Sequence, residues 1–183
     1  MKRLLLTISG KDKPGIIAKV SELLYRIGCN LEDVSMTLLE GQFAMMMTVC
    51  VPGSVKLNAL TKAMTALKSS PWGMECFMAG LKGKATRGEK HARGVQPCLI
   101  TAFGKDRTGI VHAVSKTLAQ YKINITDLDC RILGGGSKVT YAMLLEVDVP
   151  KRMGLGRLRG ILARVAKKLK IEIQLRPHET LSL

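Results

Sequence analysis

The stretch that decides the fold is "GKDKPGI" at residues 10–16, and a near copy of it, "GKDRTGI", stands at residues 104–110. Each copy follows a short apolar run, "RLLLTIS" or "PCLITAF", which is typical of a β-strand. After each copy, apolar residues recur three and four positions apart, as in an amphipathic helix. The phrase therefore marks a strand-to-helix junction that occurs twice in one chain.

The repeat extends well beyond this phrase. A shift of 94 residues aligns identical pairs that include Val20 with Val114 and Asn30 with Asn124, and an insertion around "GGGS" then changes the shift to 98. Both copies continue with two alternating strands, a second apolar helix and a closing strand, "WGMECFMAG" or "IEIQLRP". The sequence therefore indicates an internal duplication.

The alternating segments define the expected sheet faces. In the first copy, with a hairpin turn at Glu40-Gly41, one face carries Phe43, Met45, Met47, Val49 and Val51. The corresponding face of the second copy carries Val139, Tyr141, Met143, Leu145, Val147 and Val149. The second helices are expected to bury Leu57, Leu60, Met64 and Leu67, and Leu158, Ile161, Leu162, Val165 and Leu169.

These patterns predict an α+β protein of two tandem ferredoxin-like βαββαβ domains, each a four-stranded antiparallel sheet with two helices on one face. The expected boundaries are 1–81 for the first domain, 82–96 for a basic linker, and 97–183 for the second domain with a short C-terminal tail. Because such a sheet leaves its other face and its edges uncovered, a homo-oligomer, in the simplest case a dimer, is expected.

Composition narrows the class of protein. No apolar run is long enough to cross a membrane, and "MKRLLLTISGKD" lacks the features of a signal peptide, so a cytoplasmic protein without membrane contact is expected. The five cysteines and three histidines are scattered without paired spacing, which predicts neither disulfides nor a metal site. No catalytic constellation or cofactor motif is recognisable. The chain is predicted not to be an enzyme and to need no cofactor.

The net charge of +15 is concentrated in the linker and the second domain. Residues 151–170 hold eight basic side chains and no acidic one, and the linker adds Lys82, Lys84, Arg87, Lys90 and Arg93. The expected surface for an anionic partner is Arg157, Arg159, Arg164 and Lys168. An acidic protein, a nucleic acid, or solvent alone on an ordinary charged helix face each fits this pattern.

The first loop carries D-x-P-G-I, and an Asn opens the next strand fifteen residues after the glycine. This arrangement resembles the ACT domain family. The segment "GCNLED" followed by a G-x-F-x-M strand is similar to the tandem proteins of the glycine cleavage system transcriptional repressor family. The second copy departs from the pattern, because Thr108 replaces the proline.

The resemblance implies a small effector, commonly an amino acid, bound where the loop faces a neighbouring domain. It assigns the ligand-binding role to Asp12, Pro14, Gly15, Ile16 and Asn30, and to Asp106, Gly109, Ile110 and Asn124. Open amides at a helix N-terminus suit a carboxylate, and an Asp with an Asn suits an ammonium group. A structural interpretation stays open, in which Asp12 caps a helix that begins at Pro14 and Asn30 only turns the chain.

The loops do not match nucleotide-binding motifs, since a P-loop requires Lys after its last glycine and Ile16 follows Gly15. The favoured hypothesis is an amino-acid-responsive regulator, with glycine as a candidate ligand, that affects transcription through a protein partner. The first copy is the favoured site because it keeps the proline. The alternatives are a nucleic-acid-binding module acting through residues 82–96 and 151–170, and a dimerisation scaffold without a ligand.

Overall fold

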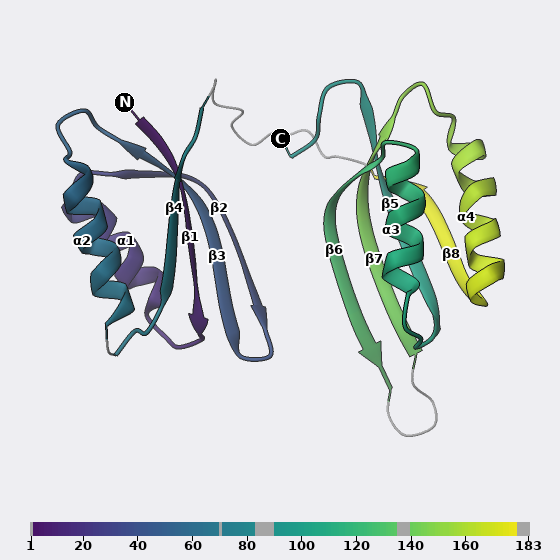
Figure 1. The fold of residues 1–183 in the computed structure, drawn as a ribbon, viewed down its shortest axis with the longest axis horizontal. Coiled ribbons are helices and arrows are strands. Elements are labelled where there is room, and N and C mark those ends of the chain that lie inside the picture. The colour runs from purple at the N-terminus through teal and green to yellow at the C-terminus, as the bar shows by residue number, and fades with distance from the viewer. Residues whose placement is uncertain (1, 70, 83–89, 135–139, 179–183) are drawn as a thin grey trace. The chain divides into compact units, whose positions relative to one another are not determined.

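The computed structural model describes residues 2–69, 71–82, 90–134 and 140–178, with the side chain of Leu57 left undescribed. The predictions for Lys84, Arg87 and Val139 lie outside the described residues. The chain divides into two compact units, Met1–Gly88 and Glu89–Leu183 (Figure 1). Within the described ranges, no helix is both long and apolar enough to cross a membrane.

Both units have the element order βαββαβ. The first unit consists of β1 (Lys2–Lys11), α1 (Ile16–Arg26), β2 (Asn30–Leu39), β3 (Gln42–Val51), α2 (Leu57–Lys68) and β4 (Glu75–Gly80). The second consists of β5 (Val95–Lys105), α3 (Ile110–Gln120), β6 (Asn124–Leu133), β7 (Thr140–Pro150), α4 (Leu155–Leu169) and β8 (Ile171–Pro177). The antiparallel strand orders are β2-β3-β1-β4 and β6-β7-β5-β8. The predicted fold class is confirmed.

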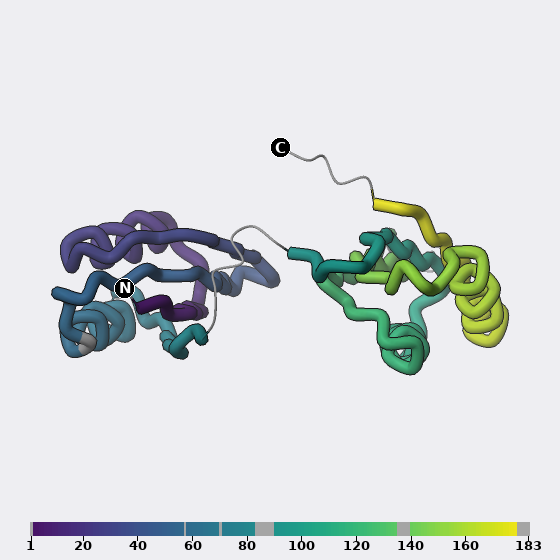
Figure 2. The backbone as a smooth tube through the Cα atoms, turned by 90° about the horizontal axis from the view of Figure 1, so that it is seen from above, coloured from purple at the N-terminus to yellow at the C-terminus, as the bar shows by residue number. Residues whose placement is uncertain are grey.

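The core of each unit lies between its sheet and its two helices, which share one face of the sheet (Figures 1 and 2). Alternate residues of the central strands point into it, including Leu6, Ile8, Met45 and Val49 of the first unit. From the helices come stripes such as Val20 and Leu24, or Val114 and Leu118. Ile17 is apolar but half exposed, so it lies outside this buried stripe of α1.

Turn geometry sets the register of the β2–β3 hairpin. Glu40 and Gly41 have φ angles of 49° and 72°, the two successive left-handed residues that a tight two-residue hairpin turn needs. A slip of one position would turn Phe43 and Met45 out of the core. The short turn therefore holds the predicted face of β3 toward the helices.

The two glycines of each repeated phrase have different structural roles. Gly15 and Gly109 both have φ of 92°, in the left-handed region that favours glycine. Gly10 and Gly104 sit where a neighbouring segment approaches the backbone. A Cβ on Gly104 would lie 2.5 Å from Cγ2 of Ile171, and one on Gly10 would lie 2.8 Å from Sδ of Met74.

The two close-approach glycines are expected to differ in their tolerance of alanine. Gly104→Ala should lower the free energy of unfolding by about 1–3 kcal/mol, because Cβ and Cα of Ile171 also lie within 3.2 Å and cannot swing away. Gly10→Ala should lower it less, since the Met74 thioether is flexible. Urea unfolding followed by circular dichroism measures both.

Gly160→Ala is the matched control, because no described atom lies within 4 Å of its added methyl group in α4. It should leave stability unchanged or raise it by up to about 1 kcal/mol. A Gly104→Ala variant as stable as the unaltered chain would contradict the close packing of β5 against β8.

Candidate functional site

Each repeated loop leads into a helix whose N-terminus has no side-chain cap from the described residues. Gly15 is the N-cap of α1, the helix begins at Ile16, and no side chain of a described residue caps it. Gly109 and Ile110 have the same roles in α3. The predictions that Asp12 caps the helix and that Pro14 is its first residue are therefore wrong. The first-turn amides are left available to an anion.

The residues predicted to bind a ligand in the first loop differ in their exposure. Asp12 is exposed, and its amide donates to the carbonyl of Gly41 at 2.9 Å, which ties the loop to the β2–β3 turn. Pro14 is also exposed, in the turn ahead of α1. Ile16 is buried as a whole residue, at 2% exposure, so its side chain lies in the core and not on the loop surface. Ile110 is equally buried in the second unit.

A residue that sequence reasoning passed over lies beside the first loop. The indole of Trp72 comes within 3.4 Å of the position that a Cβ on Gly15 would take. Lys13 reinforces this contact, since its ammonium group donates to the carbonyl of Pro71. Around Gly109, by contrast, no described atom lies within 4 Å of the corresponding position. An aromatic side chain therefore lies against Gly15, and none from the described residues lies against Gly109. The sequence signal for this residue is that Trp72 is the only tryptophan in the chain.

The second loop has a different neighbour, Tyr141, which pairs with Gly104 across β5 and β7. Burial raises the pKa of the Tyr141 phenol, and the Cys130 thiol and the Asp106 carboxylate raise it further. The Asp106 carboxylate is thus close enough to the Tyr141 phenol to disfavour its ionisation. The residue paired with Gly10 in the first unit is Phe43, which is buried and carries no polar group.

Within one unit, the predicted Asn does not join the loop. Asn30 pairs with Cys50, which pairs with Arg3, whereas Asp12 follows the opposite end of β1. The nine residues from Arg3 to Lys11, eight steps along the strand, span roughly 26 Å. Asn30 and the loop residues therefore lie at opposite ends of the sheet.

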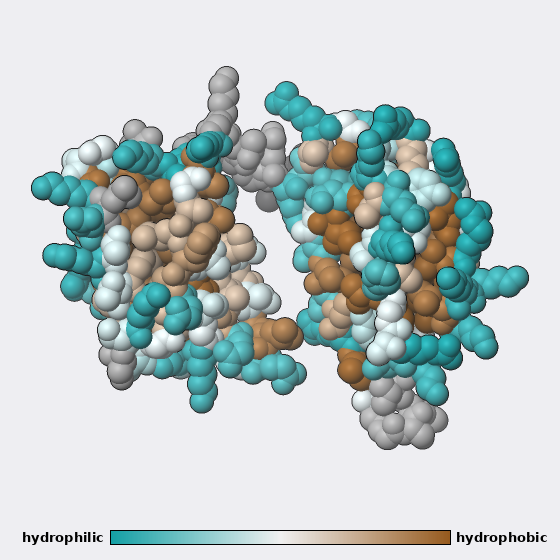
Figure 3. Space-filling view, in the orientation of Figure 1, coloured by the Kyte–Doolittle hydropathy of each residue, from teal (hydrophilic) through white to brown (hydrophobic). Residues whose placement is uncertain are grey.

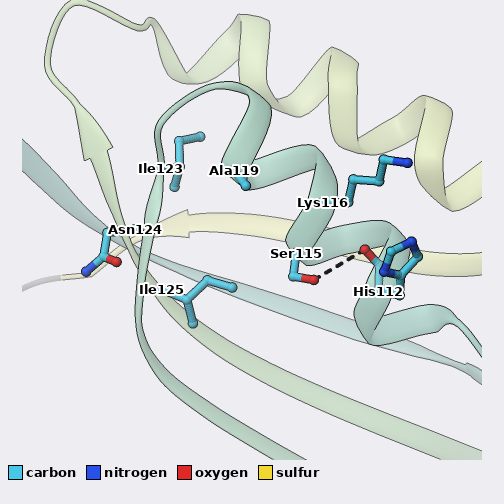
Figure 4. A pocket seen from close by; sticks show the side chains of 7 residues that line it. All are labelled: His112, Ser115, Lys116, Ala119, Ile123, Asn124 and Ile125. Carbon is cyan, nitrogen blue, oxygen red and sulfur yellow. Dashed lines mark hydrogen bonds between the residues drawn. The ribbon is translucent and has the colours of Figure 1, made fainter.

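Asn124 has the same placement in the second unit, where it pairs with Asp148. It borders a groove of 450 Å³ with His112, Ser115, Lys116, Ala119, Ile123 and Ile125. Figure 4 shows the Asn124 amide directed away from α3, while Ile125 points toward that helix. The groove contains none of the loop residues 104–110, so the structure does not assemble the predicted set in one place.

The predicted cationic residues divide between two sides of α4. Arg164 and Lys168 line a groove of 390 Å³ against α3, together with His112 and Lys116. Arg157 lies over the ring of Tyr121, 5.9 Å from its centre. Arg159 instead faces β8. Figure 3 shows hydrophilic side chains along the outer side of α4.

Sequence comparison identifies the two units. The family model described as "ACT domain" matches residues 2–78 and 96–176, so the chain belongs to the ACT domain family and carries two copies of the domain. Among curated proteins, a UPF0237 protein of Methanopyrus kandleri is 45% identical over 49 residues, which is 27% of this chain and 54% of that protein. The chain thus spans about half the length of this relative. A UPF0237 protein of Neisseria meningitidis is 33% identical over 82 residues, which is 44% of this chain and 87% of that protein.

Two solved structures match nearly the whole chain. An unknown protein from Galdieria sulphuraria has a TM-score of 0.80 at 23% identity, covering 97% of this chain and 99% of that one. A protein solved as a proposed glycine cleavage system transcriptional repressor has a TM-score of 0.71 at 18% identity, covering 98% of both chains. At these identities the matches show a shared fold.

The environment of Tyr141 predicts a pH dependence of stability. An unfolded tyrosine ionises near a pH of about 10, whereas the pKa of folded Tyr141 is raised. Above that pH the unfolded chain releases this proton before the folded one does, so stability falls as the pH rises. Tyr141→Phe should remove this part of the loss, measured as the difference in urea midpoint between pH values of about 9 and 11.

The matched control is Tyr25→Phe, which removes an exposed tyrosine from α1 of the other unit. It should leave the alkaline loss of stability as in the unaltered chain. An identical loss in Tyr141→Phe would contradict the described surroundings of Tyr141.

Proposed function

We propose that this ACT-domain protein is a non-enzymatic cytoplasmic regulator that binds an amino acid, with glycine the first candidate, and affects transcription through a protein partner. The supporting observation is the first loop, where no side chain of a described residue caps α1, Asp12 is exposed, and the indole of Trp72 lies against Gly15. The ACT domain is a regulatory amino-acid-binding fold. The repressor-like structure that matches along 98% of the chain supports the transcriptional role.

The chemistry of the loop favours an α-amino acid. A carboxylate would accept hydrogen bonds from the open amides and gain from the positive end of the α1 dipole. The ammonium group would donate to Asp12. The Trp72 indole, 3.4 Å from the position of a Cβ on Gly15, would form one wall of the ligand site.

The position of Asn30 bears on the oligomeric state. Since Asn30 is at the opposite end of its own sheet from Asp12, an Asn30 that completes the first site would come from a second copy of the chain. We therefore propose a homodimer in which the loop of one protomer and the Asn of its partner hold the ligand. Asp106, Gly109, Ile110 and Asn124 remain the corresponding proposal for the second copy.

Trp72 provides a direct measurement of ligand binding. As the sole tryptophan, it should change its emission when an amino acid binds beside Gly15. Titration with each of the twenty amino acids, by fluorescence and calorimetry, should identify at least one that binds. Asp12→Ala should weaken that binding by about tenfold or more, since a charge-assisted hydrogen bond contributes about 1.5–3 kcal/mol.

Asp106→Ala is the control, because it removes the equivalent carboxylate from the second copy. It should leave the Trp72 response unchanged. If folded protein shows no heat and no change in emission with any amino acid, the sensor proposal fails, and the scaffold without a ligand becomes the better account.

A second surface, the groove between α3 and α4, is proposed to contact the acidic partner. Its cations are Lys116, Arg164 and Lys168, and no described residue forms an ion pair with any of them. Such unpaired charges on one concave surface attract an anionic group. An acidic protein is the favoured partner, because the structure carries no DNA-reading element of the helix-turn-helix type in its described residues.

Charge reversal tests whether binding to a polyanion depends on the cations of this groove or only on the net charge of the chain. The double variant Arg164→Glu with Lys168→Glu should elute from a heparin column at a lower salt concentration than the double variant Arg159→Glu with Arg176→Glu. The latter pair lines the surface between α4 and β8. Equal elution would show that only net charge matters. Retardation of duplex DNA or RNA that is lost in the first variant alone would favour a nucleic acid as the partner.

A further inference from the structure

A cluster of ionisable side chains in the second unit is unrelated to the repeated loop. Glu146 and Asp148 stand two residues apart on β7, on the opposite face from the core residues Leu145 and Val147. His91 reaches them from the segment before β5, and His178 from the residue after β8. The pairing of β5 with β7 and β8 brings these three segments together.

Asp148 fixes the orientation of the His91 ring. This carboxylate is only 4% exposed; its Oδ1 lies 2.7 Å from Nδ1 of His91, and its Oδ2 accepts a hydrogen bond from the Ala92 amide at 3.2 Å. An imidazole that donates from Nδ1 to a carboxylate presents the lone pair of Nε2 on its other side. The same arrangement holds histidine ligands in metal sites.

The free nitrogen of His91 faces another acceptor. Nε2 of His91 lies 3.0 Å from Oε1 of Glu146. A neutral imidazole lone pair and a carboxylate oxygen repel one another at this distance, so the pair requires a proton or a metal cation between them. The second oxygen, Oε2, is already paired with the ammonium group of Lys90, and this contact raises the pKa of Lys90.

His178 supplies a third donor. Its backbone amide donates to the carbonyl of Pro97 at 3.0 Å, and its Nδ1 lies 3.9 Å from Oε1 of Glu146. One ligand atom from each of His91, Glu146 and His178 lies within 4.8 Å of the other two. Ligand atoms around a tetrahedral zinc ion are separated by about 3.3 Å, so a small rotation of the exposed His178 ring would complete the geometry.

We propose that His91, Glu146 and His178 bind a divalent transition-metal ion of the zinc or cobalt type, with Asp148 as the positioning residue behind His91. Two imidazoles and one carboxylate are a donor set suited to such ions, and water would complete the coordination. The ion would connect the segments that precede β5 and follow β8 to β7. The role inferred is structural, and no reaction is assigned to the ion.

The competing account is a proton in place of the metal ion. In that case His91 as an imidazolium donates to Asp148 and Glu146, and His178 is not needed. The two accounts therefore differ in the role of His178 and in whether the folded chain takes up metal. Both can be measured on the full chain without an affinity tag.

The test is a titration of the untagged chain with Co²⁺, followed by its visible absorption spectrum, and competition for Zn²⁺ against a chromophoric chelator. One equivalent should bind. His91→Ala, His178→Ala and Glu146→Gln should each weaken binding by more than about 100-fold, and Asp148→Asn by about 10–100-fold. His112→Ala removes the remaining histidine and should leave the affinity unchanged.

The isosteric Glu146→Gln variant guards against a loss of fold, because circular dichroism should show it folded while Zn²⁺ no longer raises its melting temperature. No binding by the folded, unaltered chain would overturn the proposal. Binding that persists in the doubly substituted His91→Ala and His178→Ala chain would also overturn it. So would a thiolate-to-cobalt charge-transfer band, which would place the ion on the cysteines instead.

Discussion

The close approach of a closing segment to a glycine of the central strand is the constraint on which each unit depends. At Gly104, the side chain and backbone of Ile171 occupy the space that a Cβ would need, and Met74 does the same at Gly10. The contact lets β8 or β4 begin directly beside the end of the central strand. A few residues later, Gly15 or Gly109 adopts a left-handed conformation and starts the helix that covers the core. One short phrase therefore joins the sheet to the helical layer in both units.

The same backbone junction has acquired different surroundings in the two copies. Trp72 stands against the first loop, whereas Tyr141, with its raised pKa, lies near the second. Both differences come from residues outside the repeated phrase, on elements that the fold brings to the loop. Duplication thus preserved the backbone of the junction, with its glycine N-cap, while the side chains around it diverged.

The second unit also carries a cluster of charged side chains on the face of its sheet opposite the helices. Asp148 is nearly inaccessible, yet it is satisfied by His91 and by the Ala92 amide, both from the segment that precedes β5. That segment falls within the basic stretch that the sequence places in the linker, but Lys90 and His91 contact Glu146 and Asp148 of the second unit. Buried charge of this kind is stable only when it is paired, so these contacts hold the segment to the sheet.

The sequence by itself determined the duplication, the order of elements, the hairpin at Glu40-Gly41 and the buried faces, because these depend on local periodicity and on turn residues. Only the tertiary structure decided that Asn30 lies far from Asp12, that Trp72 flanks Gly15, and that His91 and His178 both approach Glu146. The physical reason is that strand pairing joins residues distant in the chain. From the spacing of the histidines along the sequence we predicted no metal site, and from the position of Asp12 we predicted a helix cap. The register of the paired strands sets the actual distances between these side chains, and those distances decide which of them can form one site.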